Sequence, residues 1–104
     1  MAQYDIYRNA NPHTRRAIPF LLDVQSDLLD PLATRVVVPL IRKSEIPNPA
    51  RRLNPVFEVE GTEVVMSTPE LVGVLREALG SKVASLSERR ADILAALDLQ
   101  FTGI

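Results

Sequence analysis

Cysteine and tryptophan are absent from this chain of 104 residues, which has only one histidine and four glycines. Without cysteine, the chain cannot form a disulfide framework, a thiolate metal site or a cysteine nucleophile. No apolar run approaches the roughly 20 residues that a membrane-spanning helix needs. The first residues lack the basic region followed by an apolar region that is typical of a signal peptide. We therefore expect a cytoplasmic protein with no membrane partner.

An excess of charge of either sign is also missing. The chain has 12 Lys and Arg against 13 Asp and Glu, a net charge of −1. It therefore has no overall electrostatic preference for phosphate backbones. The hydrophobic fraction of 46% is too high, at so low a net charge, for a disordered chain. The length predicts one domain over residues 1–104 with a small core, which association with a second copy would help to stabilise.

Strand signals dominate the first two thirds of the chain. Alternating and β-branched residues predict strands, and Gly61 supplies the positive φ that a two-residue hairpin turn requires. Pro19 indicates a sheet edge or the start of a strand. The three valines from Val36 to Val38 indicate burial on both faces of a sheet. The expected strands cover residues 4–7, 18–24, 35–40, 56–59 and 62–66.

A helix is predicted over residues 86–101. Ser85 and Glu88 have the spacing of a capping box, and apolar residues follow at four-residue intervals up to Phe101. Strands followed by one long helix predict an α+β fold, an antiparallel sheet with the helix packed on it.

The preceding segment, residues 68–80, fits two local structures. Thr68 and Pro69 are typical of a helix start, and Gly80 of a helix end. The same segment also fits a strand with a bulge at Gly73. Local propensity alone slightly favours the helix.

Side chains suited to catalysis are few. His13, the only histidine, lies in a polar loop over residues 9–16, and no sequence neighbour marks it as a general base. Asp23, Asp27 and Asp30 match no calcium-loop spacing, so we interpret them as turn and capping residues. No glycine-rich phosphate loop is present. The residues favour a binding protein over an enzyme, and we expect no cofactor and no metal.

Two local features indicate surfaces for a partner. The first is a basic stretch in the loop of residues 42–52, which is either a solvated loop or a contact for an anionic partner such as RNA or an acidic peptide. It consists of Arg42, Lys43, Arg51 and Arg52. The second is the end of the final helix, which carries Phe101 almost to the last residue. A terminal carboxylate adds to the negative end of the helix dipole, which favours a cationic group on the partner.

Three parts of the chain carry a resemblance to a known family. They are the segment Asp23-Val24-Gln25-Ser26-Asp27-Leu28-Leu29-Asp30, the segment Arg35-Val36-Val37-Val38-Pro39-Leu40, and the final helix ending in Gly103-Ile104. The match also includes Leu53-Asn54-Pro55, Met66-Ser67-Thr68 and Leu86-Ser87. Together they resemble the CcdB family, the toxins of CcdA–CcdB toxin–antitoxin modules. The resemblance implies the fold shared with MazF-type toxins: a twisted antiparallel sheet of about five strands, a small second sheet and a long C-terminal helix. It also places a strand in the ambiguous segment 68–80.

The resemblance further implies activity without catalysis. CcdB proteins form homodimers, bind the A subunit of DNA gyrase and trap the enzyme on cleaved DNA. A CcdA-type antitoxin neutralises them, and the complex contacts operator DNA only through the antitoxin. The implied gyrase contacts are Thr102, Gly103 and Ile104, supported by Asp98 and Phe101, with Leu28 and Leu29 beside them. An acidic antitoxin tail would bind arginines, for which the candidates are Arg15, Arg16, Arg42 and Arg51.

The chain departs from the family pattern at the contact surface. Thr102 replaces a tryptophan, and Asp98 replaces an asparagine. Tryptophan often dominates interface energy, so a degenerate toxin that binds antitoxin but no longer poisons gyrase is one alternative. The other is a MazF-like endoribonuclease on the same fold, with His13 as base and Arg15 or Arg16 as the cationic group.

Overall fold

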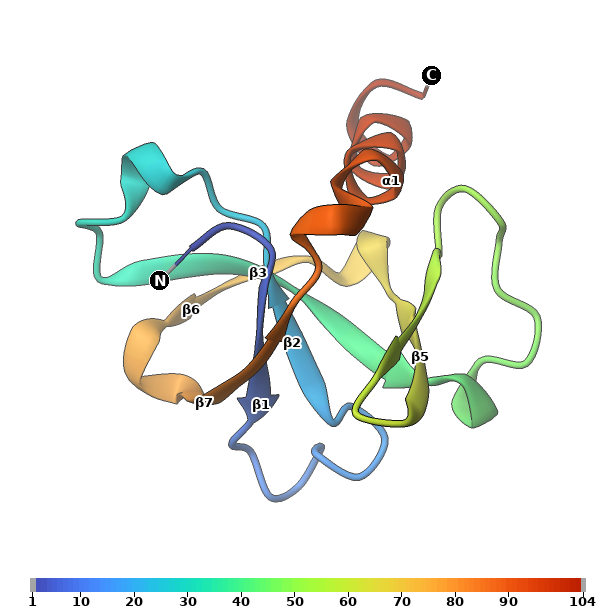
Figure 1. Ribbon diagram of the computed structural model, residues 1–104, viewed down its shortest axis with the longest axis horizontal. Coiled ribbons are helices and arrows are strands. Elements are labelled where there is room, and N and C mark those ends of the chain that lie inside the picture. Colours follow the sequence, from blue (N-terminus) through green and yellow to red (C-terminus); the bar gives the residue numbers. More distant parts are fainter. Residues whose placement is uncertain (1, 104) are drawn as a thin grey trace.

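The computed structural model describes residues 2–103 and shows a curled antiparallel sheet with one α-helix after it (Figure 1). The strands are β1 (Asp5–Asn9), β2 (Phe20–Asp23), β3 (Thr34–Arg42), β4 (Val56–Val59), β5 (Thr62–Met66), β6 (Val72–Leu75) and β7 (Leu79–Ser85). The helix α1 spans Arg90–Thr102. Five 3₁₀ turns lie between these elements: η1 (Asp27–Leu29), η2 (Lys43–Glu45), η3 (Thr68–Glu70), η4 (Arg76–Ala78) and η5 (Ser87–Arg89). The predicted α+β class is confirmed.

The nine-residue β3 is the strand around which the sheet is built. The sheet order is β4-β5-β3-β2-β1-β7, and β6 pairs with the first half of β3. Along β3, Thr34–Val37 pair with β6 and Leu40–Arg42 pair with β5, while β2 pairs with residues 37–40. The described strands therefore form one sheet, and the expected second sheet is joined to the first through β3. Pro19 directly precedes β2, which is paired on both sides, so it marks the start of a strand and not a sheet edge.

The core lies between one face of the curled sheet and α1. Side chains from five strands meet Ile93 and Ala96 of the helix, both of which are fully buried. Val37 and Val38 are also fully buried although consecutive strand residues point to opposite faces. This confirms the prediction of burial on both faces for Val37 and Val38, whereas Val36 is only partly buried. Besides Ile93, the largest members of the core cluster are Tyr4, Ile6, Phe20, Leu22, Leu40, Phe57, Met66 and Leu86.

The hairpin of β4 and β5 has the predicted two-residue turn. Glu60 has φ 50° and Gly61 has φ 76°, and Val59 pairs with Thr62 on either side of them. Two consecutive positive φ angles are what a type I′ turn requires, and its twist matches that of the strands. Gly61 meets this requirement without the steric cost of a side chain.

Residues 68–80 contain strand and short 3₁₀ turns rather than an α-helix, in agreement with the strand that the family resemblance implied. Thr68 begins a single 3₁₀ turn, and β6 then pairs with β3 in a regular register with Gly73 opposite Val36. The expected bulge at Gly73 is therefore wrong. Register shifts occur instead between β1 and β7, where Gly80 lies close to Arg8. The sequence analysis did not predict β7 as a separate strand.

The final helix starts later than predicted, and its capping box does not form. Ser85 is the last residue of β7, and its Oγ accepts a hydrogen bond from the Ser87 N–H at 3.2 Å. The 3₁₀ turn η5 then places Glu88 before the α-helix, so Glu88 does not occupy the third helical position. The helix itself continues to Thr102, close to the predicted end. None of the described helices is long and apolar enough to cross a membrane.

Candidate functional site

The C-terminal end of α1 presents an apolar side chain to solvent. The Phe101 side chain is 67% exposed, and Asp98, Thr102 and Gly103 are also exposed. Gly103 adopts the left-handed conformation, with φ 74°, and its N–H donates to the Leu99 carbonyl at 3.1 Å. This glycine therefore ends the helix as a typical C-cap. Ile104, the remaining predicted contact at this end, lies outside the described residues.

Thr102 is turned back toward the helix that carries it. Its Oγ1 donates a hydrogen bond to the Asp98 carbonyl at 2.6 Å. The hydroxyl is thus occupied within α1, which leaves the methyl group and the neighbouring Phe101 ring as the apolar contact area. Asp98 lies one turn earlier and is exposed. This end of α1 can bind a partner through an apolar contact beside a carboxylate, and a helix C-terminus further favours a cation there.

The Asp23–Asp30 segment forms a second exposed surface, which buried contacts hold in position. Asp23 is fully buried, and its Oδ2 accepts hydrogen bonds from Nε and Nη2 of Arg35, which is itself fully buried. Its Oδ1 accepts from the Gln25 N–H at 3.0 Å. Burial raises the pKa of the Asp23 carboxyl, while the charge and hydrogen bonds of Arg35 act in the opposite direction. This ion pair fixes β2 to β3 where the segment begins.

Gln25 and Ser26 then shape the turn that follows. The Gln25 amide nitrogen donates to the carbonyls of Leu29 and Thr34, and its oxygen accepts from the Val36 N–H. The Ser26 Oγ caps η1 by accepting from the Leu28 N–H at 3.2 Å. The resulting turn leaves the Leu28 side chain 90% exposed and that of Leu29 48% exposed.

The aspartates of this segment are used for structure. Asp27 accepts from the Gln3 N–H at 2.7 Å, and Asp30 forms ion pairs with Arg35 and Arg76. Among residues 2–103, no group of three or more His, Asp or Glu residues is placed to hold a metal ion. The interpretation of Asp27 as a turn residue agrees with this geometry.

Leu28 and Leu29 lie far from the end of α1 in the same chain. Figure 1 shows η1 and the C-terminal end of α1 on separate sides of the molecule. The expectation that they lie beside the helix end is therefore not met within one copy. Another copy would have to bring the two surfaces together.

The four arginines predicted to bind an antitoxin fall into two regions. Arg42, at the end of β3, donates from its Nε to the Arg16 carbonyl at 2.7 Å, so these two residues lie together. Arg15 is exposed in the same loop as Arg16. His13 is also exposed there, and its backbone N–H donates to Asn11 Oδ1. Arg51 lies elsewhere, next to α1.

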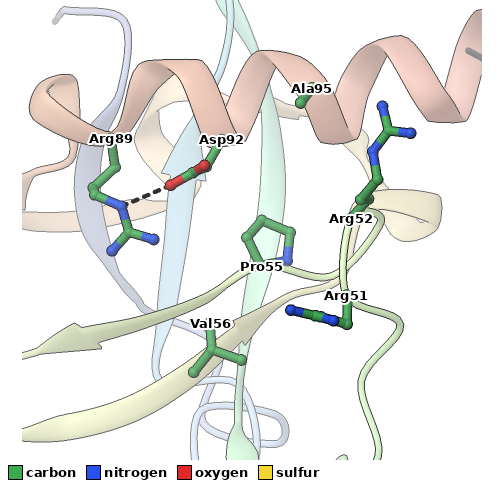
Figure 2. A pocket seen from close by; sticks show the side chains of 7 residues that line it. All are labelled: Arg51, Arg52, Pro55, Val56, Arg89, Asp92 and Ala95. Atoms are coloured by element: carbon green, nitrogen blue, oxygen red, sulfur yellow. Dashed lines mark hydrogen bonds and ion pairs between the residues drawn. The ribbon is translucent and has the colours of Figure 1, made fainter.

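Arg51 lines a pocket of about 360 Å³ between the loop before β4 and the first half of α1. Figure 2 shows Arg51 and Arg52 on one side of Pro55 and an ion pair between Arg89 and Asp92 on the other. In that pair, Arg89 Nε lies 2.9 Å from Asp92 Oδ2. The lining residues are Arg51, Arg52, Pro55, Val56, Arg89, Asp92 and Ala95.

Arg89 was not among the residues predicted for a site, and its side chain is 47% exposed at the start of the helix. In the structure, the Arg89 guanidinium carbon lies 4.7 Å from the centre of the Phe57 ring. The i, i+3 spacing to Asp92 was the one signal in the sequence that its side chain would be held in place.

Comparison with known proteins places the chain in a family and supports its fold. The family described as CcdB protein matches residues 3–103. Among solved structures, the chain is similar to an endoribonuclease in complex with its cognate antitoxin from a Mycobacterial species. The two are 14% identical with a TM-score of 0.75, and the match covers 96% of this chain and 93% of that chain. At this identity the likeness concerns the fold.

Proposed function

This chain belongs to the CcdB family of toxins from toxin–antitoxin modules, and from that membership we propose that it acts by binding the A subunit of DNA gyrase. Binding would trap gyrase on cleaved DNA, and the toxin itself would catalyse no reaction. The single observation that carries the proposal is the family match over residues 3–103. The exposed end of α1 supports it, because this is where the family resemblance puts the gyrase contact.

The proposed contact surface centres on Phe101, with Thr102 and Gly103 following it. Phe101 offers a large apolar ring to a partner, and Asp98 offers a carboxylate that suits an arginine on gyrase. Thr102 contributes less apolar area than the family's tryptophan. We therefore assign to Phe101 the larger part of the binding energy.

We further propose that the toxin acts as a homodimer. A two-fold arrangement that brings two α1 ends together would make one bivalent surface for a symmetric target. It also offers a way for Leu28 and Leu29 of one copy to join the helix end of the other, since they do not meet within one chain. A CcdA-type antitoxin would then bind over this surface and link the complex to operator DNA.

The test is binding of the purified protein to the dimerisation fragment of the gyrase A subunit. We expect tight binding that is lost in a variant lacking Gly103 and Ile104. Phe101→Ala should weaken binding at least about tenfold, or about 1.4 kcal/mol. The matched control is Leu94→Ala, a half-exposed apolar residue about 10 Å earlier along the helix axis. No binding by the intact protein would overturn the gyrase proposal and favour a degenerate toxin.

An endoribonuclease is the second candidate, because a solved structure with this fold is one. Its catalytic groups would come from the exposed loop that carries His13, Arg15 and Arg16. A general base needs a partner to orient it, and among residues 2–103 the His13 side chain has no hydrogen-bond partner. Incubation of the purified protein with RNA distinguishes the two. Cleavage that is lost in His13→Ala would replace the gyrase proposal.

A further inference from the structure

The pocket beside α1 is lined mainly by cationic side chains. Arg51, Arg52 and Arg89 line it with a single carboxylate, that of Asp92. The lining therefore carries a net charge of about +2, counting three guanidinium groups against one carboxylate, although the whole chain carries −1. The remaining lining residues Pro55, Val56 and Ala95 are apolar. An anionic group with an apolar neighbour fits this combination.

The Arg89 guanidinium is held in place before any partner binds. Its Nε donates to Asp92, and its guanidinium carbon lies over the ring of Phe57, which is 2% exposed. Within residues 2–103, its two terminal nitrogens donate no hydrogen bond. A guanidinium fixed in this way loses little side-chain entropy when a carboxylate binds its free edge in a bidentate manner.

Arg51 supplies the second cationic group from the opposite wall. Figure 2 shows its guanidinium directed toward Val56 and the space under Pro55. Arg51 is exposed, and in the described part of the chain its side chain makes no hydrogen bond or ion pair. A carboxylate between Arg51 and Arg89 would therefore gain partners without displacing existing ones from Arg51.

We propose that this pocket receives an acidic side chain of a partner peptide, and, resting on the function proposed above, that this peptide is a segment of the antitoxin. A glutamate or aspartate would lie between Arg51 and Arg89, and an adjacent apolar residue would contact Pro55 and Ala95. The helix face of the pocket continues through Leu99 to Thr102, because Asp92, Ala95, Leu99 and Thr102 share one face at helical spacing. A bound segment that follows this face reaches Thr102, at the edge of the proposed gyrase contact.

Nucleic acid fits the pocket less well. Base stacking needs exposed aromatic faces, and the one ring at this site, Phe57, is buried under Arg89. A net charge of −1 also gives no overall attraction for a phosphate backbone, which would extend beyond the pocket. A peptide presents its charge at a single side chain and adds apolar contacts.

The test uses the full chain labelled with ¹⁵N and a short acetylated peptide with two glutamates separated by leucine. We expect the backbone amide signals of residues 51–56 and 89–95 to shift on titration. A peptide with glutamine in place of glutamate should bind the chain at least about tenfold more weakly than the glutamate peptide. The glutamate peptide should also bind the Arg51→Glu variant at least about tenfold more weakly than it binds the unchanged chain. Lys82→Glu is the matched control, since it makes the same change of charge at a side chain that is 55% exposed on β7, at the other end of the strand order from β4.

Three results would overturn the proposal. One is the absence of shifts in these residues at about millimolar peptide. Another is an equal loss of affinity in Lys82→Glu, which would show that overall charge decides. The third is a single-stranded RNA oligonucleotide that shifts the same signals at lower concentration than the peptide. Binding of the gyrase fragment is measured on the same Arg51→Glu sample. This measurement shows whether the gyrase proposal fails independently of the peptide proposal.

Discussion

Asp23 and Arg35 are both fully buried, and each neutralises the charge of the other. Removal of one member of such a pair leaves an uncompensated charge in the interior, which usually costs roughly 3 to 5 kcal/mol. We expect Asp23→Asn to lower the free energy of unfolding by that amount in urea denaturation. The control is Asp30→Asn, because the Asp30 carboxylate is 43% exposed and its loss should cost much less than the loss of Asp23. Equal losses in the two variants would contradict a dominant role for the buried pair.

Tyr7 makes the free energy of unfolding depend on pH in the alkaline range. Burial, the charges of Asp5 and Asp23, and a hydrogen bond donated to Asp5 raise the pKa of Tyr7 to about 12. An unfolded tyrosine titrates near pH 10, so this contribution to stability is complete below about pH 10 and is lost as the pH rises through about 12. The difference corresponds to roughly 2.7 kcal/mol.

The measurement is the free energy of unfolding as a function of pH, followed together with phenolate absorbance. The free energy should fall between about pH 10 and 12. Tyr7→Phe should remove the larger part of this fall. Tyr4→Phe should remove a smaller part, since burial also raises the pKa of Tyr4. A pH dependence that persists unchanged in Tyr7→Phe would show that another group is responsible.

Single residues also show what the sequence could not predict at the site. Phe101 and Gly103 were identifiable because a helix pattern runs up to them. The role of Arg89 was not, because it depends on a ring that lies 32 positions earlier in the chain, Phe57. Contacts between distant residues leave no local pattern, so the basic stretch around Arg51 could not be divided into pocket and loop from sequence alone.

Among the elements, β7 depends on a close approach to β1. A Cβ atom on Gly80 would lie 2.8 Å from the Arg8 carbonyl oxygen, which is backbone and cannot move aside cheaply. We expect Gly80→Ala to lower the free energy of unfolding by roughly 1 to 3 kcal/mol. Gly73→Ala in β6 is the matched control, since a Cβ there meets nothing within 4 Å. Its effect should stay within about 0.5 kcal/mol. Similar losses in both variants would rule out the contact with Arg8 as the cause.

The elements that were hardest to predict are those whose structure is set by a partner strand. Residues 75–79 have high helix propensity, but Leu75 ends β6, which pairs with Thr34–Val37 of β3, and Arg76–Ala78 form only a 3₁₀ turn before β7 begins. The start of α1 is a similar case. Ser85 was expected to cap the helix, yet it belongs to β7 because its backbone pairs with Asp5. Tertiary contacts override local propensity in both places.

For the whole molecule, we expect a homodimer. A mass of twice 11.5 kDa should be found in sedimentation velocity at micromolar concentration. The midpoint of thermal unfolding should rise with protein concentration, because association stabilises only the folded chain. A midpoint that is independent of concentration, with the mass of one chain, would contradict the bivalent surface proposed for gyrase.

The fold class was predictable at this scale because the whole pattern of strands and one final helix was visible, and the family resemblance supplied the architecture. The sequence did not allow us to predict that all described strands join in one sheet. Their union depends on β3 pairing with three different strands, and which strands share a partner cannot be deduced from hydrophobic alternation. The sequence therefore predicted which residues form strands better than how those strands are arranged.

The shared strand β3 also determines where this molecule can change during evolution. The turn that presents Leu28 and Leu29 leads into β3 at Thr34, and the loop that carries Arg51 follows β3 after Arg42. A one-residue insertion within β3 would exchange the faces of Val37 and Val38 and misalign three neighbouring strands at once. Insertions in the two loops would leave this pairing intact. Such a chain can acquire new targets and new inhibitors by altering the length and sequence of its loops, while its scaffold stays the same.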